Sequence, residues 1–134
     1  MAVLLDTNAL LWAEFHDPRL GAKSAQLIDD AVRTGRAFVC PISYWEVQLG
    51  INRNRIALSV TIEQWRQNHL AAGYIERAIT GIDTMLMGKL PDLHGDPADR
   101  LVMAVAINAG LTLLTADEKI LVWPGQLARQ DTRR

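Results

Sequence analysis

Four acidic residues in this chain of 134 residues are placed where a divalent metal could be held. They are Asp6, Glu46, Asp99 and Asp117. Two carboxylates about 4 Å apart repel by roughly 4 kcal/mol at an effective dielectric of about 20, so a cluster of them calls for cations. Oxygen ligands without a His or Cys partner suit Mg²⁺ or Mn²⁺, which can activate a bound water for attack on phosphate. These residue types therefore predict metal-assisted hydrolysis.

The elements that must position the acids alternate along the chain as short apolar runs and amphipathic segments. Strands are expected at residues 2–5, 37–40, 74–79 and 111–115. Helices are expected to begin near residue 9 and to cover residues 21–33, 43–52, 62–72, 83–90, 96–108 and 117–122. This alternation predicts an α/β domain in which helices flank both faces of a central parallel sheet. We expect one domain over residues 1–128 and a polar tail over 129–134, and we expect the chain after Pro124 to be frayed.

Parallel sheets place their functional crevice at the carboxyl ends of the strands. Asp6 directly follows the first expected strand, and Asp117 comes two residues after the last. Each also has a structural interpretation as a helix cap. For Asp6, however, Thr7 or Asn8 is available for capping, which leaves the acid without a structural task.

The other two acids fall in the first turns of expected helices. Glu46 and Ser43 match the S-x-x-E capping box, so Glu46 is either a cap or a functional group. Asp96 precedes Pro97 and is expected to cap its helix. Asp99 then lies in the first turn, where the helix dipole stabilises an ionised acid whether or not it binds metal.

The composition indicates a folded protein, with 49% hydrophobic and 22% charged residues. The formal net charge is −1, and an excess of basic groups remains when the four acids are set aside, which is compatible with a polyanionic substrate. Cys40 is the only cysteine, which excludes an intramolecular disulfide and favours a reducing compartment. Asp6 comes too early for a signal peptide, and no apolar run approaches the roughly 20 residues of a membrane span. We therefore expect a soluble, cytoplasmic protein.

Four segments resemble the successive motifs of PIN-domain proteins, and most closely those of the VapC-like toxins of bacterial type II toxin–antitoxin systems. The segments are Leu4–Trp12, Ser43–Val47, His94–Arg100 and Leu114–Glu118. Any one of them is a weak signal, whereas four in this order, covering nearly the whole chain, are specific. The resemblance implies a three-layer α/β/α PIN-like domain.

The resemblance also implies roles for individual residues. The implied metal ligands are Asp6, Glu46, Asp99 and Asp117. Asp99 takes the third position rather than Asp96 because it adjoins Arg100. Thr7 and Thr115 are the implied polar supports, and Asp96 holds the helix that carries Asp99.

The activity implied by the resemblance is that of an endoribonuclease dependent on Mg²⁺ or Mn²⁺. Its implied partners are an RNA substrate, a second copy of the chain in a homodimer, and an antitoxin that inserts a helix, often with an arginine, near the acids. Many relatives carry a lysine one turn after the motif glutamate, where this chain has Gly50. A basic contact is therefore missing or is supplied by Arg53 or Arg55.

Several basic and aromatic residues are candidates for RNA contacts. The basic candidates are Arg53, Arg55, Lys89 and Arg100, each of which is as readily explained as an ordinary solvated charge. Trp45 and Trp65 would either stack on bases or belong to the core.

Three other interpretations of the chain stay open. It could be an RNA-processing nuclease without an antitoxin, a phosphotransfer or receiver-like α/β domain, or a scaffold in which all four acids are caps. The phosphotransfer class fits poorly. A phosphatase of that class needs an acid where Asn8 stands, and a receiver needs an aspartate where Cys40 and Pro41 stand.

Overall fold

The computed structural model describes residues 1–91 and 95–134, so His94, the first residue of the third motif, lies outside the described residues. The strands are β1 (Val3–Leu5), β2 (Ala37–Val39), β3 (Ile75–Glu76), β4 (Thr112–Thr115) and β5 (Arg129–Asp131). The helices are α1 (Thr7–Glu14), α2 (Ala22–Arg33), α3 (Ile42–Asn52), α4 (Ile62–Ala72), α5 (Gly81–Met87), α6 (Pro97–Ala109) and α7 (Glu118–Leu121). The predicted alternation of strands and helices is confirmed.

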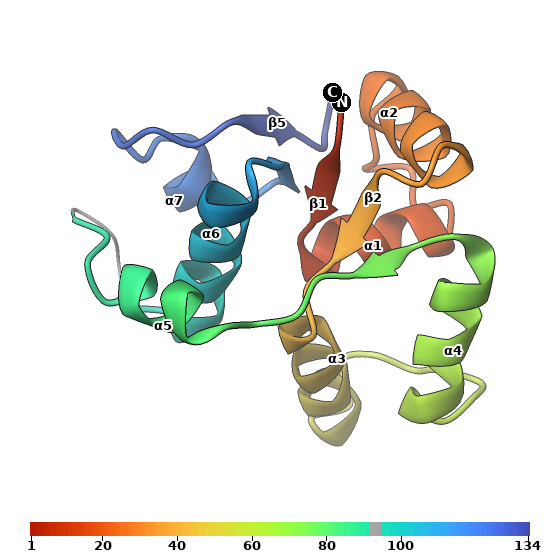
Figure 1. Ribbon diagram of the computed structural model, residues 1–134. Coiled ribbons are helices and arrows are strands. Elements are labelled where there is room, and N and C mark those ends of the chain that lie inside the picture. Colours follow the sequence, from red (N-terminus) through yellow and green to blue (C-terminus); the bar gives the residue numbers. More distant parts are fainter. Residues whose placement is uncertain (92–94) are drawn as a thin grey trace.

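All five strands run parallel in one sheet with the order β3-β2-β1-β4-β5 (Figure 1). The chain therefore builds outward from β1 through β2 to β3 and then returns to the other side of β1 to add β4. The loops that leave β1 and β4 lead to helices on opposite faces of the sheet. Such a reversal opens a crevice at the carboxyl ends of the two strands, where α/β proteins bind their ligands.

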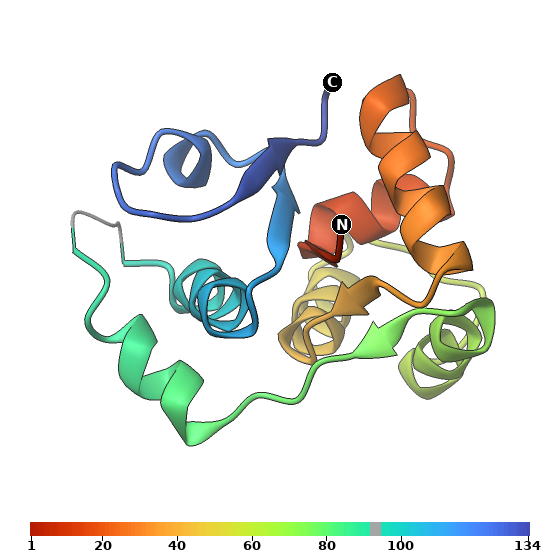
Figure 2. The same ribbon diagram turned by 45° about the horizontal axis from the view of Figure 1, so that its top comes forward.

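Alternation along the short strands divides the core into two layers. Val3 and Leu5 pack with α1, α2 and α4 on one face of the sheet. Leu4 packs with α6 and α7 on the other face. Figure 2 shows α6 and α7 on one side of β1 and α1 and α2 on the other. All three residues are fully buried, so β1 is apolar throughout, as expected for a strand of a sheet covered on both faces. Within the described residues no helix is long and apolar enough to cross a membrane.

The helix that carries Asp99 is fixed at both ends by its sequence. Asp96 caps α6 by accepting a hydrogen bond from the Ala98 amide at 3.0 Å, and Pro97 takes the first helical position, as predicted. Gly110 ends the helix in a left-handed conformation with φ of 67°.

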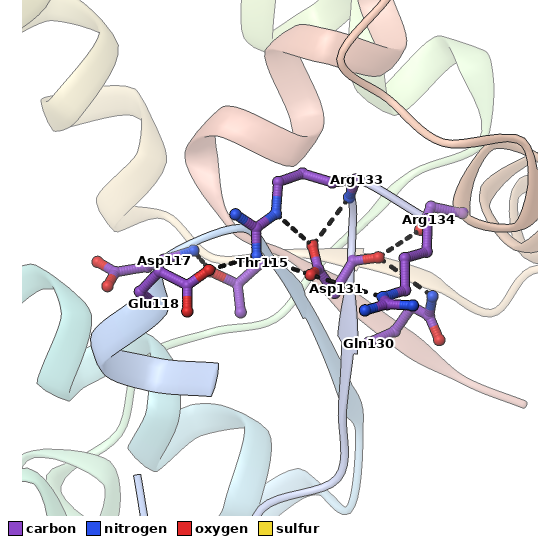
Figure 3. Close-up of polar contacts among 8 residues, drawn as sticks. Thr115, Asp117, Glu118, Gln130, Asp131, Arg133 and Arg134 are labelled. Carbon is purple, nitrogen blue, oxygen red and sulfur yellow. Dashed lines mark hydrogen bonds and ion pairs between the residues drawn. The ribbon is translucent and has the colours of Figure 1, made fainter. Parts of the chain in front are cut away.

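The expectation of a frayed tail is wrong for residues 129–131, which form β5 alongside β4. The tail continues onto α2, where the Gly21 amide donates to the Thr132 carbonyl at 2.8 Å. The Arg133 side chain bonds Asp131 and Glu118 (Figure 3). The polar sequence gave no sign of a strand here, because β5 at the edge of the sheet is ordered by its backbone hydrogen bonds and not by buried apolar side chains. The division of the chain at residue 128 stays a prediction.

Gly21 is the position at which side-chain size decides whether the tail can dock. A Cβ atom at residue 21 would lie 2.0 Å from the Arg134 carbonyl carbon, so Gly21→Ala must displace backbone. We expect this variant to lose about 1–3 kcal/mol in the free energy of unfolding, the usual cost of overpacking. Urea denaturation measures this loss.

Gly81→Ala is the matched control, because a Cβ atom at this helix start meets nothing within 4 Å. We expect this variant to unfold at the same urea concentration as the wild type or slightly above it. Equal losses in both variants would show that the tail does not depend on close approach at Gly21.

Candidate active site

One open pocket of about 810 Å³ lies at the crevice between β1 and β4. Its lining includes six acids, and we refer to it as the acid pocket. The acids are Asp6, Asp17, Glu46, Asp96, Asp99 and Asp117. The four acids singled out in the sequence thus line the same pocket although they come from four separate segments of the chain. Asp96, expected only to cap a helix, lines it as well.

Asp6 is the N-cap of α1, contrary to the expectation that Thr7 or Asn8 would take that role. Its Oδ1 accepts a hydrogen bond from the Ala9 amide at 2.8 Å. Desolvation by burial raises the pKa of Asp6 to about 6, and the charges of Glu46 and Asp117 add to the rise. Two further acids thus act on the Asp6 carboxyl, and a bound cation would oppose their effect.

Glu46 does not form the capping box that its sequence suggested. The N-cap of α3 is Pro41, so Ser43 lies inside the helix instead of at its cap. The Thr7 hydroxyl donates to Glu46 Oε1 at 2.6 Å and lies 2.9 Å from the Ser43 hydroxyl. Burial is the main cause of the raised pKa of Glu46. Glu46 is therefore held by a contact from α1 and has no capping task.

Thr115, the last residue of β4, connects two of the acids. Its buried hydroxyl accepts a hydrogen bond from the Asp117 amide at 3.1 Å (Figure 3). The same side chain is hydrogen-bonded to the Asp6 carboxyl, which lowers the pKa of Asp6 against the effect of burial. Asp117 also caps α7, where its Oδ1 accepts from the Lys119 amide at 2.8 Å.

The start of α6 supplies two more acids of the pocket lining, Asp96 at the N-cap and Asp99 in the first turn. Asp99 is half-buried there, and the charge of Asp96 contributes to the raised pKa of Glu46. Arg100 turns toward the segment after α5, where its Nη1 donates to the Met87 carbonyl at 2.9 Å and to the Leu90 carbonyl at 3.2 Å. Arg100 is not among the residues that line the pocket.

The donor set fits a divalent ion bound mainly through water. Across residues 1–91 and 95–134, no three acidic, histidine or cysteine side chains are placed to hold one metal ion together. A Mg²⁺ site needs fewer direct protein ligands, because the ion keeps several waters and is usually bound through one or two carboxylates. Because the lining residues that the structure describes offer carboxylates and no His or Cys, the pocket suits Mg²⁺ or Mn²⁺ and does not suit a zinc site with three direct protein ligands.

Some of the tryptophans and basic residues proposed from the sequence as RNA contacts line the acid pocket, and others do not. Trp65 is buried in the core and donates from Nε1 to Glu14 at 2.7 Å. Trp45 is 57% exposed and lines the acid pocket together with Arg53 and Arg55. Lys89 does not line it.

One pocket residue had no signal in the sequence. Arg19 follows α1 in an irregular segment and lines the acid pocket. Its guanidinium lies 4.8 Å from the centre of the Trp12 ring and forms an ion pair with Asp17 at 2.7 Å. Only the folded structure brings this loop to the pocket.

The fold is that of a known family. The family model of the PIN domain matches residues 3–122, and the chain belongs to this family. One relative, "Ribonuclease VapC22" of Mycobacterium tuberculosis, is 31% identical over an alignment of 121 residues that covers 88% of this chain and 88% of the relative. The resemblance to PIN-domain proteins of the VapC type is thereby confirmed.

Solved structures of toxin–antitoxin complexes share the fold. VapBC2 from Rickettsia felis, bound to a DNA fragment from its promoter, matches with a TM-score of 0.70 at 18% identity, over 97% of this chain and 98% of that chain. DNA-bound VapBC from Salmonella typhimurium matches with a TM-score of 0.70 at 14% identity, over 98% of both chains. At these identities the likeness shows the fold alone, and it confirms the predicted three-layer α/β architecture.

The raised pKa of Asp6 predicts a stability that depends on pH in the metal-free protein. Between its ordinary value of 3.8 and the folded value of about 6, the folded state binds more protons than the unfolded state. Stability therefore falls as pH rises through that window. Asp6→Asn keeps the helix cap and removes the charge. We expect it to raise the free energy of unfolding at about pH 7 by about 1–3 kcal/mol, with the gain lost below about pH 4.

Urea denaturation in EDTA across this pH range measures the effect, with Asp17→Asn as the control. Asp17 lines the same pocket, but its contacts with Arg19 lower its pKa to about 2, so removing that charge should bring no gain. A pH-independent effect of Asp6→Asn would show that the Asp6 charge is not the source of the instability.

Proposed function

We propose that this chain is an endoribonuclease that depends on Mg²⁺ or Mn²⁺ and acts as the toxin of a toxin–antitoxin pair. The observation that carries the proposal is the gathering of four acids from separate segments in one pocket at the crevice between β1 and β4. Family membership and the relative named as a ribonuclease support the reaction class.

Asp6, Glu46, Asp99 and Asp117 are the residues that would hold the metal. A divalent ion held by these acids would supply polarisation of the phosphodiester and a water of lowered pKa for the attack. Thr7 holds the Glu46 carboxylate in place, and Thr115 does the same for Asp6. In-line attack would leave a 5′-phosphate and a 3′-hydroxyl. The cytoplasm, where cellular RNA is translated, is the compartment we propose for this reaction.

The direct test compares two neighbouring acids, only one of which lines the pocket. Asp117→Asn keeps a capping side chain for α7 but removes a charge from the acid pocket. We expect the variant to lose more than about 100-fold in RNA cleavage with Mg²⁺ or Mn²⁺, beyond the 10–100-fold typical of outer-shell partners. EDTA should abolish cleavage by the wild type. Gel analysis of an end-labelled RNA provides the measurement.

Glu118→Gln is the matched control, because Glu118 is exposed and its side chain bonds Arg133 outside the pocket. We expect full cleavage activity from this variant. Cleavage that survives EDTA, or equal activity in Asp117→Asn and Glu118→Gln, would overturn the metal-dependent mechanism.

The partners we propose are an antitoxin and a second copy of the chain. Relatives of the fold include toxins solved with their antitoxins, which supports the first. A gene for a small DNA-binding protein beside this one would favour a toxin over an RNA-processing nuclease. For the homodimer, the supporting observation is an apolar face on α5, where Ile82 is 65% and Met85 61% exposed. Beside it, an apolar groove runs between α3 and α6.

Charges placed on this face should separate the proposed dimer. We expect the double variant Ile82→Glu/Met85→Glu to sediment as a 14.9 kDa monomer under conditions in which the wild type has twice that mass. Val122→Glu is the control, because Val122 is an equally exposed apolar residue beyond α7. A wild type that sediments as a monomer, or a dimer that survives the double variant, would contradict this interface.

A further inference from the structure

Two arginines in the turn after α3 share the wall of the acid pocket. Arg53 and Arg55 both line it. Asn54 between them has φ of 56°, in the left-handed region that asparagine tolerates better than most residues. The Gly50 carbonyl accepts hydrogen bonds from the Arg55 amide at 2.8 Å and the Ile56 amide at 3.2 Å. The backbone of the turn is thus fixed by α3 itself, the helix that also carries Glu46.

These arginines differ from most others in the protein because their charges are uncompensated. Both are exposed, and within residues 1–91 and 95–134 neither side chain forms an ion pair or a hydrogen bond. Arg19, on the same pocket, is engaged by Asp17. Two free guanidinium groups therefore stand beside a pocket whose other charged groups are mainly acids.

We propose that Arg53 and Arg55 bind the phosphate backbone of single-stranded RNA beside the phosphodiester held at the acids. This inference rests on the proposed function. The acids repel a polyanion until metal is bound, so attraction must come from cations placed along the path of the strand. The planar guanidinium fork matches phosphate oxygens in a bidentate geometry. Such contacts position the strand without reading its sequence.

The structure selects these two residues among the four basic candidates of the sequence. Lys89 and Arg100 do not line the acid pocket, and Arg100 donates to the carbonyls of Met87 and Leu90. Trp45, exposed on the same helix, borders the acid pocket and the apolar groove. The strand would thus run from the acids along the outer face of α3 to the turn at Asn54.

Binding measured against salt concentration tests the inference. Fluorescence anisotropy of a labelled single-stranded RNA of mixed sequence is followed in KCl titrations, with EDTA present so that the RNA stays intact. We expect Arg53→Gln/Arg55→Gln to lower the slope of log affinity against log salt by about 1.4, because each phosphate contact on a single strand contributes about 0.7. Affinity at low salt should fall at least about tenfold.

The control removes the same number of charges near the amino end of β2, away from the carboxyl ends of the strands where the acid pocket lies. Arg33→Gln/Arg36→Gln changes the end of α2 and the residue before β2, neither of which lines the pocket. We expect its salt slope to match that of the wild type. Arg53→Lys/Arg55→Lys should restore most of the slope, because the charges return, but only part of the affinity, because the fork is lost. Matching thermal unfolding midpoints exclude misfolding.

The readouts separate this inference from the proposed function. A lowered slope in a protein that cleaves no RNA would support the arginine site while refuting the nuclease. Normal metal-dependent cleavage with an unchanged slope in Arg53→Gln/Arg55→Gln would overturn the arginine site. Weakened binding to the antitoxin with unchanged RNA binding would overturn it too, because the two arginines would then belong to a protein interface.

Discussion

The burial of a carboxylate beside other acids is the constraint on which the site of this protein depends. Asp6 cannot move away from the other acids, because one of its oxygens caps α1 and its side chain is also bonded to Thr115. Burial and the charges of Glu46 and Asp117 then favour its neutral form. The ionised Asp6 therefore lowers the free energy of unfolding at neutral pH, and a bound divalent cation would offset this loss. Such a loss of stability at a functional site is common in enzymes.

Most of the fold could be predicted because its signals are local. Apolar runs marked the strands β1, β2 and β4, and Asp96-Pro97 marked the start of α6. The short polar strand β5 could not be found in this way, because its order comes from backbone bonds to β4 and the packing of the tail on Gly21. Edge strands that bury little side-chain surface leave no periodic pattern.

Capping patterns show why sequence could locate the acids but not their local contacts. Ser43 and Glu46 match a capping box, yet Ser43 lies inside α3 and Glu46 pairs with Thr7 from another helix. The reciprocal box lies at α5, where Thr80 and Asp83 exchange hydrogen bonds and start the helix earlier than expected. Ser43 cannot act as the cap because α3 already begins after Pro41, directly beyond the end of β2. The sequence likewise could not show that Arg53 and Arg55 line the acid pocket without ion-pair partners among the described residues, because this depends on how the turn at Asn54 folds.

The docking of the tail has a consequence for biosynthesis. The Thr132 amide donates to the carbonyl of Thr115, the residue that connects Asp6 with Asp117. The β4 end of the acid pocket is therefore fastened by residues made more than a hundred positions after Asp6. A nascent chain leaves the ribosome starting with its N-terminus, so all four acids are made before β5, the strand that completes the sheet beside β4. In a newly made molecule the β4 end of the acid pocket therefore stays incomplete until the last residues of the sequence have been made and have docked.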